Sequence, residues 1–210
     1  MSEKLFLNDF IKIIKNIKKT MQDNANYLSE LDSTVGDGDH GITMARGFKS
    51  VMSKLEEVTP RDISELLKKV GFTLISTMGG AAGPIFGSIF TEMAKITDGK
   101  DQIDLPTLYE MFNSALDKVS KLGGALPGDK TLVDSLSPAV ISLRESLSSN
   151  LSIKEALKLM TTAAEQGAVS TKDMIATKGK ARYLAERSLG YQDTGATTMY
   201  LIIKSIYEAI

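Results

Sequence analysis

The sequence of 210 residues contains no cysteine and a single histidine. The lack of cysteine excludes disulfides, thiolate metal sites and cysteine nucleophiles, and it is compatible with a reducing cytosol. One histidine excludes any site that needs two imidazoles. The 25 Lys and Arg residues nearly balance the 26 Asp and Glu residues, so the chain lacks the basic surplus of a general nucleic-acid-binding protein.

Long apolar runs are also missing from the sequence. No run approaches the roughly 20 residues that span a bilayer, and no signal-peptide pattern opens the chain. No linker, internal repeat or low-complexity tract divides it. We therefore expect a soluble cytoplasmic protein with one domain over residues 1–210, no membrane association and no nucleic-acid partner.

Helical periodicity extends over most of the chain, and no convincing strand pattern interrupts it. The pattern predicts eight helices, at residues 6–30, 42–56, 60–78, 84–97, 106–122, 130–149, 153–177 and 194–209. The joints between them are short, which favours antiparallel neighbours. The predicted fold is all-α, an eight-helix antiparallel up-and-down bundle or barrel.

Two of the predicted helices begin with a recognisable capping signal. Thr59 before Pro60 predicts an N-cap followed by proline at the first helical position, with Asp62 in the first turn. Ser152 and Glu155 have the spacing of a capping box. The helix that follows Ser152 has a face of small residues, which would let a neighbouring helix approach closely.

Glycines gather in four groups, each at or near a predicted helix junction. The groups are Gly36, Gly38 and Gly41; Gly79, Gly80 and Gly83; Gly123, Gly124 and Gly128; and Gly190 with Gly195. Any one group could simply punctuate two helices. In a closed up-and-down arrangement, alternate junctions lie at the same end, so several of these loops could build one site.

The densest chemistry lies in residues 31–41, LDSTVGDGDHG. The G-x-G-x-x-G spacing within it does not predict a dinucleotide-binding fold, because a helix rather than a strand precedes it and its carboxylates would repel a bare pyrophosphate. An EF-hand is excluded too, since the twelfth position counted from Asp32 or Asp37 is not acidic.

The remaining interpretation of this loop is a compact oxygen-ligand metal site. Asp32, Asp37 and Asp39 would repel one another strongly unless a cation neutralised them. Oxygen ligands without thiolates favour Mg²⁺, which keeps coordination positions open for phosphates. The alternative is a solvated Asp/Gly turn. His40 could contact phosphate or ribose, or make a structural hydrogen bond; a role as general base lacks a matching nucleophile.

Two further loops could contact an anion. The sequence GGAAGP at 79–84 leads into a helix, and glycine-rich backbone at a helix N-terminus suits phosphate, although a Gly-Pro break would look the same. The sequence GGALPGDKT at 123–131 nearly matches a Walker A loop, but Asp129 intervenes before Lys130 and no strand precedes it. A P-loop fold is therefore excluded, while a nucleotide contact is not.

Taken together, these motifs resemble one family. The segments LDSTVGDGDHGITMARGF, GGAAGPIFG, GDKTLVDSL and KGKARYLAERSLGYQDTGA are similar, in this order, to the nucleotide-binding L subunit of bacterial dihydroxyacetone kinase of the phosphotransferase-system-dependent type. The resemblance implies an eight-helix antiparallel barrel with ADP and two Mg²⁺ ions at one end.

The resemblance also implies which residues form that site. It assigns the metal ligands to Asp32, Asp37 and Asp39. It assigns the nucleotide contacts to His40, Gly41, Ile42, Thr43, Ala81, Ala82, Gly123, Leu132, Lys180, Asp193, Thr194 and Gly195. No catalytic residue is expected in this chain, because the substrate-binding and acid–base groups would belong to a partner.

Four positions depart from the family's usual pattern. Ala82 stands where serine is frequent, so one hydroxyl contact to phosphate is missing. Lys180 stands where arginine is frequent, which keeps the charge but loses bidentate geometry. Leu132 replaces a common methionine, and Thr194 replaces a frequent proline.

The function implied by the resemblance is phosphoryl transfer through a tightly bound nucleotide. A phosphohistidine on an M subunit would phosphorylate the bound ADP, and the γ-phosphoryl would pass to dihydroxyacetone held on a K subunit. One alternative is the nucleotide domain of an ATP-exchanging dihydroxyacetone or fatty-acid kinase, which the chain length disfavours. A non-catalytic helical metal-binding module is the other.

Overall fold

The computed structural model describes residues 4–210, and the regular elements of this part of the chain are all helices. The helices are α1 (Leu7–Asp23), α2 (Ala25–Val35), α3 (His40–Glu57), α4 (Ile63–Thr77), α5 (Ala82–Ile96), α6 (Leu105–Gly123), α7 (Val133–Ser148), α8 (Ile153–Ser170), the 3₁₀ helices η1 (Thr171–Asp173) and η2 (Lys180–Ser188), and α9 (Thr194–Ala209). Over the described residues there is no strand, only an isolated antiparallel bridge between Leu5 and Ile103.

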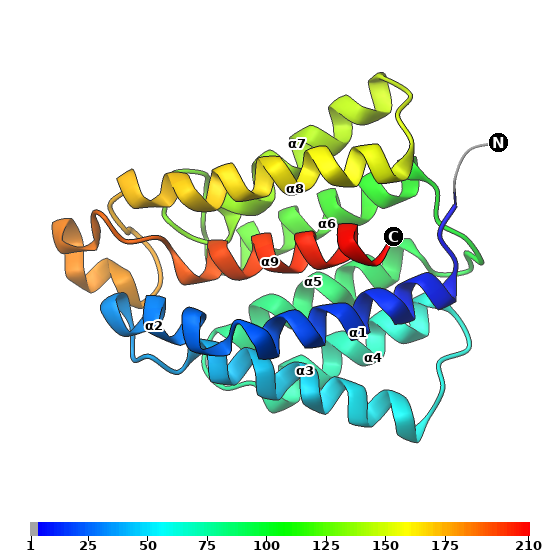
Figure 1. Ribbon diagram of the computed structural model, residues 1–210, viewed down its shortest axis with the longest axis horizontal. Helices are drawn as coiled ribbons and strands as arrows, with labels where there is room; N and C mark the ends of the chain where they lie inside the picture. The colour runs from blue at the N-terminus through cyan, green and yellow to red at the C-terminus, as the bar shows by residue number, and fades with distance from the viewer. Residues whose placement is uncertain (1–3) are drawn as a thin grey trace.

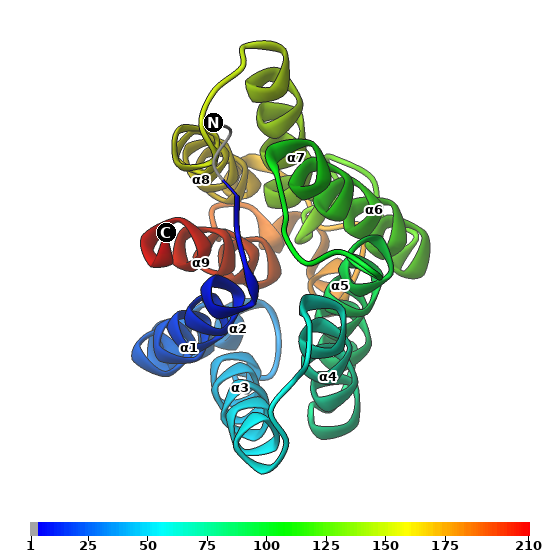
Figure 2. The same ribbon diagram turned by 90° about the vertical axis from the view of Figure 1, so that its right-hand side faces the viewer.

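In the described chain, eight long helices close into a ring. Neighbours along the chain run in alternate directions (Figure 1, Figure 2). Each helix contacts the next in the order α1, α3, α4, α5, α6, α7, α8 and α9, and α9 in turn contacts α1. The shorter α2 follows α1 at one end of the ring and packs on α3. The predicted antiparallel eight-helix barrel is therefore confirmed, with α2 as an addition to it.

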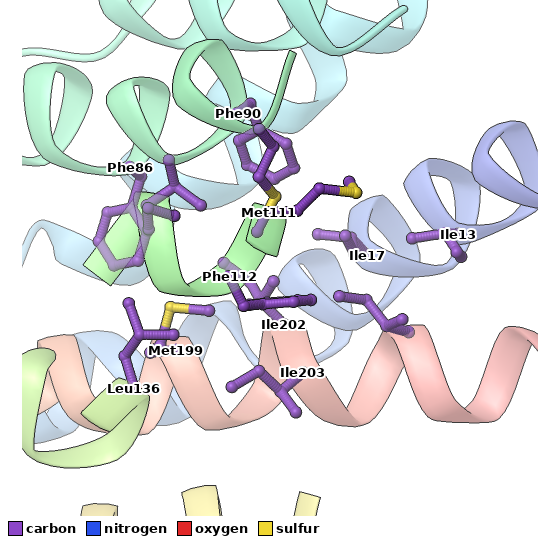
Figure 3. Close-up of a cluster of buried hydrophobic side chains, with 14 of the residues drawn as sticks. Ile13, Ile17, Phe86, Phe90, Met111, Phe112, Leu136, Met199, Ile202 and Ile203 are labelled. Atoms are coloured by element: carbon purple, nitrogen blue, oxygen red, sulfur yellow. The ribbon is translucent and has the colours of Figure 1, made fainter. Parts of the chain in front are cut away.

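The interior of the ring is a hydrophobic core, part of which is drawn in Figure 3. Ile17 of α1, Phe112 of α6 and Ile203 of α9 are all at most 2% exposed. Each such side chain stabilises the fold by roughly 1.5–3 kcal/mol through burial. Within the described chain, no helix is both long and apolar enough to cross a membrane.

The first predicted helix, 6–30, is in fact two helices that meet at Asn24. The backbone at Asn24 has φ −104° and ψ 8°, outside the helical range. Its side-chain amide donates to the carbonyl of Thr20 at 2.9 Å, so the side chain competes with the backbone for a helical acceptor. The apolar stripe continues across this break, which explains why the periodicity alone predicts one helix.

The predicted cap at Thr59 is wrong, because α4 begins three residues later. Asp62 is the N-cap, and its carboxylate accepts from the backbone N–H of Glu65 at 2.7 Å. The Glu65 carboxylate in turn accepts from the N–H of Arg61 at 2.9 Å. This reciprocal pair satisfies two backbone donors at the start of α4, which favours a helix that begins after Asp62.

The capping box at Ser152 and Glu155 is confirmed, as is the close approach of the small-residue helix behind it. A Cβ on Gly167 of α8 would lie 2.1 Å from the carbonyl oxygen of Asp134 in α7. Pro138, one turn later in α7, has no N–H for that carbonyl. Any larger residue at 167 would separate the two helices.

The end of the predicted helix 153–177 is also wrong. Helix α8 ends at Ser170, and the chain then makes an excursion through η1 and η2 before α9 begins. We call residues 171–191 the strap. The predicted helix 130–149 likewise begins later, at Val133.

Candidate functional site

A pocket of about 380 Å³ lies at one end of the barrel, the end at which α2 and the strap are seen on the left of Figure 1. This volume falls in the range of roughly 300–1,000 Å³ typical of small-molecule sites. Its walls come from the loop before α3, the starts of α5, α7 and α9, and the strap. The alternating helix directions bring these loops together, as the glycine groups predict.

Three carboxylates occupy one side of the pocket. Asp32, in the last turn of α2, and Asp37 and Asp39, in the loop before α3, each place an oxygen within 4.8 Å of the other two. All three line the pocket, and Asp37 and Asp39 are exposed. A single divalent cation could therefore contact all three, and oxygen ligands of this kind suit Mg²⁺.

Helix N-termini face the same pocket. Helices α3 and α5 begin there without a side-chain cap in the part of the chain that the structure describes. By contrast, α4, α6 and α8, which begin at the opposite end, are capped by Asp62, Asp104 and Ser152. The backbone N–H groups and positive dipole ends of α3 and α5 are thus left for an anion.

His40 is the first residue of α3 and lies between the acidic loop and the core. Its Nε2 is 2.8 Å from the hydroxyl of Thr198, and that hydroxyl donates to the carbonyl of Thr194 at 2.9 Å. Because the single hydroxyl proton is used there, Nε2 must carry the ring proton and donate to Thr198. Burial lowers the pKa of His40, so the ring is neutral near pH 7.

The start of α9 contributes an unusual pair of polar groups. Asp193 is partly buried, and loss of water around its carboxyl raises its pKa to about 7. It caps α9 by accepting from the N–H of Ala196 at 2.7 Å. The hydroxyl of Thr194 lines the pocket, is buried, and has no hydrogen-bond partner among the described residues. A buried polar atom without a partner needs an explanation, and the place of this hydroxyl in the pocket wall suits a hydrogen bond to a bound ligand.

Cationic side chains also line the pocket. Lys180 of the strap pairs with Asp37, at 2.5 Å between Nζ and Oδ2. This contact lowers the pKa of Asp37 and raises that of Lys180. Lys178 and Arg46 also line the pocket. The site therefore offers carboxylates for a cation next to lysines, an arginine and helix N-termini for an anion.

Most residues assigned to the site from the sequence meet in this pocket. Those that line it are Asp32, Asp37, Asp39, His40, Thr43, Ala81, Ala82, Leu132, Lys180, Asp193, Thr194 and Gly195. Gly41, Ile42 and Gly123 are not part of the lining. Gly41 is packed against α2, Ile42 is 59% exposed, and Gly123 is the exposed last residue of α6. The amides of Gly41 and Ile42 still belong to the uncapped first turn of α3.

Several lining residues were not assigned individually from the sequence, although four of them lie in the loops 79–84 and 123–131 that it proposed as anion contacts. They are Arg46, Gly79, Gly80, Ile85, Phe86, Lys130, Thr131, Lys178, Gly179 and Ala181. Arg46 could have been found from helical spacing, because it follows Thr43 by three residues on α3. Lys130 could not have been assigned its contacts from the sequence, because these lie about 40 to 60 residues further along the chain.

The chain is similar to known proteins over nearly its whole length. Residues 34–208 match the DAK2 domain family. The chain is 44% identical to the PEP-dependent dihydroxyacetone kinase, ADP-binding subunit DhaL of Escherichia coli K12, with 87% of each chain covered. It is 34% identical to the PTS-dependent counterpart of Lactococcus lactis, covering 98% of this chain and 99% of that one.

A solved structure shares the fold. The dihydroxyacetone kinase of C. freundii in complex with AMP-PNP and Mg²⁺ superposes with a TM-score of 0.75 and 26% identity, covering all of this chain and 35% of the other. The family match, the relatives and the fold agree. The chain belongs to the DAK2 domain family and is similar to ADP-binding subunits of PEP-dependent dihydroxyacetone kinases.

Proposed function

We propose that this chain is the ADP-binding subunit of a phosphoenolpyruvate-dependent dihydroxyacetone kinase and holds the nucleotide together with two Mg²⁺ ions in the pocket. Bound there, ADP would accept a phosphoryl group from a phosphohistidine on an M subunit, and the resulting ATP would transfer it to dihydroxyacetone on a K subunit. This chain's own residues bind and orient; the groups that act on dihydroxyacetone belong to the partner.

The carboxylates of Asp32, Asp37 and Asp39 would ligate the metal ions. The first-turn amides of α3 and α5, with Lys180, would neutralise phosphate oxygens. The Thr194 hydroxyl would gain the partner that it lacks. Most of phosphoryl-transfer catalysis consists of such positioning and charge stabilisation, so a chain with one histidine and no cysteine is sufficient for this role.

The observation that carries this proposal is the opposition of charge within one pocket. Three carboxylate oxygens within 4.8 Å of one another would be unfavourable beside a diphosphate unless cations lay between them. Uncapped helix N-termini on the same pocket would be unfavourable beside a cation alone. Only a ligand with both a metal ion and phosphates satisfies both sides.

The nucleotide content of the purified protein tests the proposal. Gel-filtered protein is denatured, and the supernatant is analysed by ion-exchange chromatography. One ADP per chain supports the retained carrier. ATP that is lost on filtration would favour an ATP-exchanging kinase domain, and the absence of nucleotide would favour a metal-binding module without catalysis.

The variant Asp37→Asn connects the nucleotide to the carboxylates. We expect it to weaken binding of Mg²⁺ and ADP by about tenfold or more, the scale on which loss of even an outer-shell partner weakens a metal site. Asp98→Asn is the matched control, since Asp98 is 74% exposed and pairs with Lys68 away from the pocket. Equal nucleotide content in both variants would contradict the assignment.

A further inference from the structure

Lys130 is a lysine whose side chain is buried, with 1% of its surface exposed. Its ammonium donates to three backbone carbonyls, those of Met174 at 3.1 Å, Ser188 at 2.6 Å and Tyr191 at 2.6 Å. An ammonium has three protons, so these contacts use its full donor capacity. Although Lys130 follows the Gly-Asp pair of the near-Walker sequence and lines the pocket, its donors are directed at protein backbone.

The burial of the Lys130 ammonium costs free energy unless its hydrogen bonds offset the loss of water, which indicates a specific structural role. Removal of water lowers the pKa of the ammonium, and the carboxylates of Asp193 and Asp173 oppose that effect from a distance. The backbone at Lys130 also has φ +61°, a left-handed conformation that residues with a Cβ rarely adopt. Both costs persist only where surrounding contacts offset them.

The three carbonyls belong to the two ends of the strap, residues 171–191. Met174 lies near its start, and Ser188 and Tyr191 lie near its end. Close to the same point, the N–H of Gly190 donates to the carbonyl of Lys172 at 2.8 Å, and the N–H of Ala176 donates to the Ser188 hydroxyl at 2.9 Å. Lys130 therefore joins both ends of the strap to the loop before α7.

Apolar contacts contribute little to holding the strap, whose middle is otherwise attached by hydrogen bonds from Thr177 to Asp129 and by the ion pair of Lys180 with Asp37. The apolar cluster of the strap consists of Ala176 and Ala181, with Leu184 packed against them, and is separate from the main core. The middle of the strap nevertheless supplies a wall of the pocket, with Lys178, Gly179, Lys180 and Ala181 in the lining. A segment with so small an apolar cluster opens easily unless polar contacts restrain it.

We propose that Lys130 is a positioning residue that anchors the strap, and that it thereby determines how long a nucleotide stays in the pocket. It acts through the strap rather than by contact with phosphate. The dependence on nucleotide rests on the proposed function, whereas the anchoring of the strap does not. The segment carrying Lys180 can remain opposite the acidic loop only while both ends of the strap are held.

Amide hydrogen exchange on nucleotide-free protein tests the anchor directly. In Lys130→Met, which keeps an unbranched side chain of similar length without the charge, peptides within 172–191 should exchange about tenfold faster or more, since hydrogen bonds to a charged group are lost. Peptides from α4, α5 and α6 should exchange at the wild-type rate. Lys121→Met, at an exposed lysine of α6, is the matched control and should change neither.

Two further variants separate anchoring from general damage. Ser188→Ala removes the hydroxyl that Ala176 needs, in a residue that does not line the pocket, and should also accelerate exchange in the strap. Lys130→Arg keeps the charge and should restore part of the protection. Dissociation of ADP with Mg²⁺, measured by chase with excess unlabelled nucleotide, should be faster in Lys130→Met and in Ser188→Ala.

Three outcomes would overturn the inference. Wild-type exchange in the strap of Lys130→Met together with lost ADP affinity would make Lys130 a direct phosphate ligand. Exchange raised equally in the strap and in α4–α6 would make it a general structural residue. Faster exchange in the strap of Lys130→Met with an unchanged rate of ADP dissociation would show that the strap does not control nucleotide retention. If wild-type protein bound no nucleotide, the proposed function would fail, and the exchange result would still decide the anchor.

Discussion

At the scale of single residues, hydrogen-bond partners and burial determine the protonation and orientation of the polar groups around the pocket. His40, Lys130 and Asp193 are each removed from bulk water, and each is held by groups far away in the sequence or by the start of a helix. The sequence identifies His40 and Asp193 as site residues from their motifs. It cannot supply the protonation state of either, because that depends on Thr198 and on burial, which only the folded chain creates.

His40 should be a neutral imidazole with the proton on Nε2 at pH 7. Two-dimensional ¹⁵N–¹H spectra report which ring nitrogen carries the proton. Because the chain has a single histidine, the imidazole signals in these spectra need no residue assignment. Thr198→Val removes the acceptor and leaves a partly buried N–H unpaired, which should cost about 1–3 kcal/mol of stability. Thr161→Val, which removes a hydroxyl bonded within α8, is the control. A proton on Nδ1 in the wild-type spectrum would contradict the geometry.

Asp193 should make the stability of nucleotide-free, metal-free protein depend on pH. Its pKa is about 7 in the folded chain and roughly 3.9 when unfolded. The folded state thus binds the proton more tightly, so the contribution to stability is complete below about pH 4 and is lost as the pH rises through about 7.

Comparison with Asp193→Asn isolates this contribution, since asparagine can still cap α9. Denaturant unfolding of the two proteins at several pH values should show the wild type losing up to a few kcal/mol relative to the variant between pH 5 and 8, at about 1.4 kcal/mol per pKa unit. Parallel pH curves would mean that the carboxyl keeps an ordinary pKa.

At the scale of elements, the helical pattern predicts most of the fold, and the errors occur where local contacts compete. Periodicity cannot detect the break at Asn24, because the apolar stripe continues across it. Two adjacent capping signals compete near Thr59 and Asp62, and the reciprocal contact with Glu65 favours the second. The strap has only a small apolar cluster and is held by polar contacts such as those of Lys130, so hydrophobic periodicity does not reveal it.

Gly41 belongs to the acidic-loop motif, but its structural role is in the contact between α2 and α3. A Cβ at this position would lie 1.9 Å from the carbonyl oxygen of Ala25, so the glycine lets α3 pack on α2. We expect Gly41→Ala to lower the free energy of unfolding by roughly 1–3 kcal/mol or more, as for overpacked cores. Gly79→Ala is the matched control for stability, because no atom lies within 4 Å of the added carbon. Chemical denaturation of nucleotide-free protein measures the stability of both variants. If Gly41→Ala were as stable as Gly79→Ala, the packing role of Gly41 would be contradicted.

At the scale of the whole molecule, the alternating helix directions build the site. Helices α3, α5, α7 and α9 all begin at one end, so four loops separated by tens of residues converge on one pocket. This convergence is predictable from an up-and-down order of helices. The lack of side-chain caps on α3 and α5 in the described chain is not, because it depends on which N–H groups the neighbouring side chains reach in the fold.

Thermal unfolding of nucleotide-stripped protein tests the metal-bridged site most directly. A ligand that binds only the folded state stabilises it by roughly 4 kcal/mol at a thousandfold excess over Kd. At ~2–4 °C per kcal/mol, ADP with Mg²⁺ should raise the Tm by about 8–16 °C. ADP alone should raise it much less, because three carboxylates would then face the diphosphate unshielded. A rise with ADP alone as large as that with ADP and Mg²⁺ together would contradict a site in which the metal joins the carboxylates to the nucleotide.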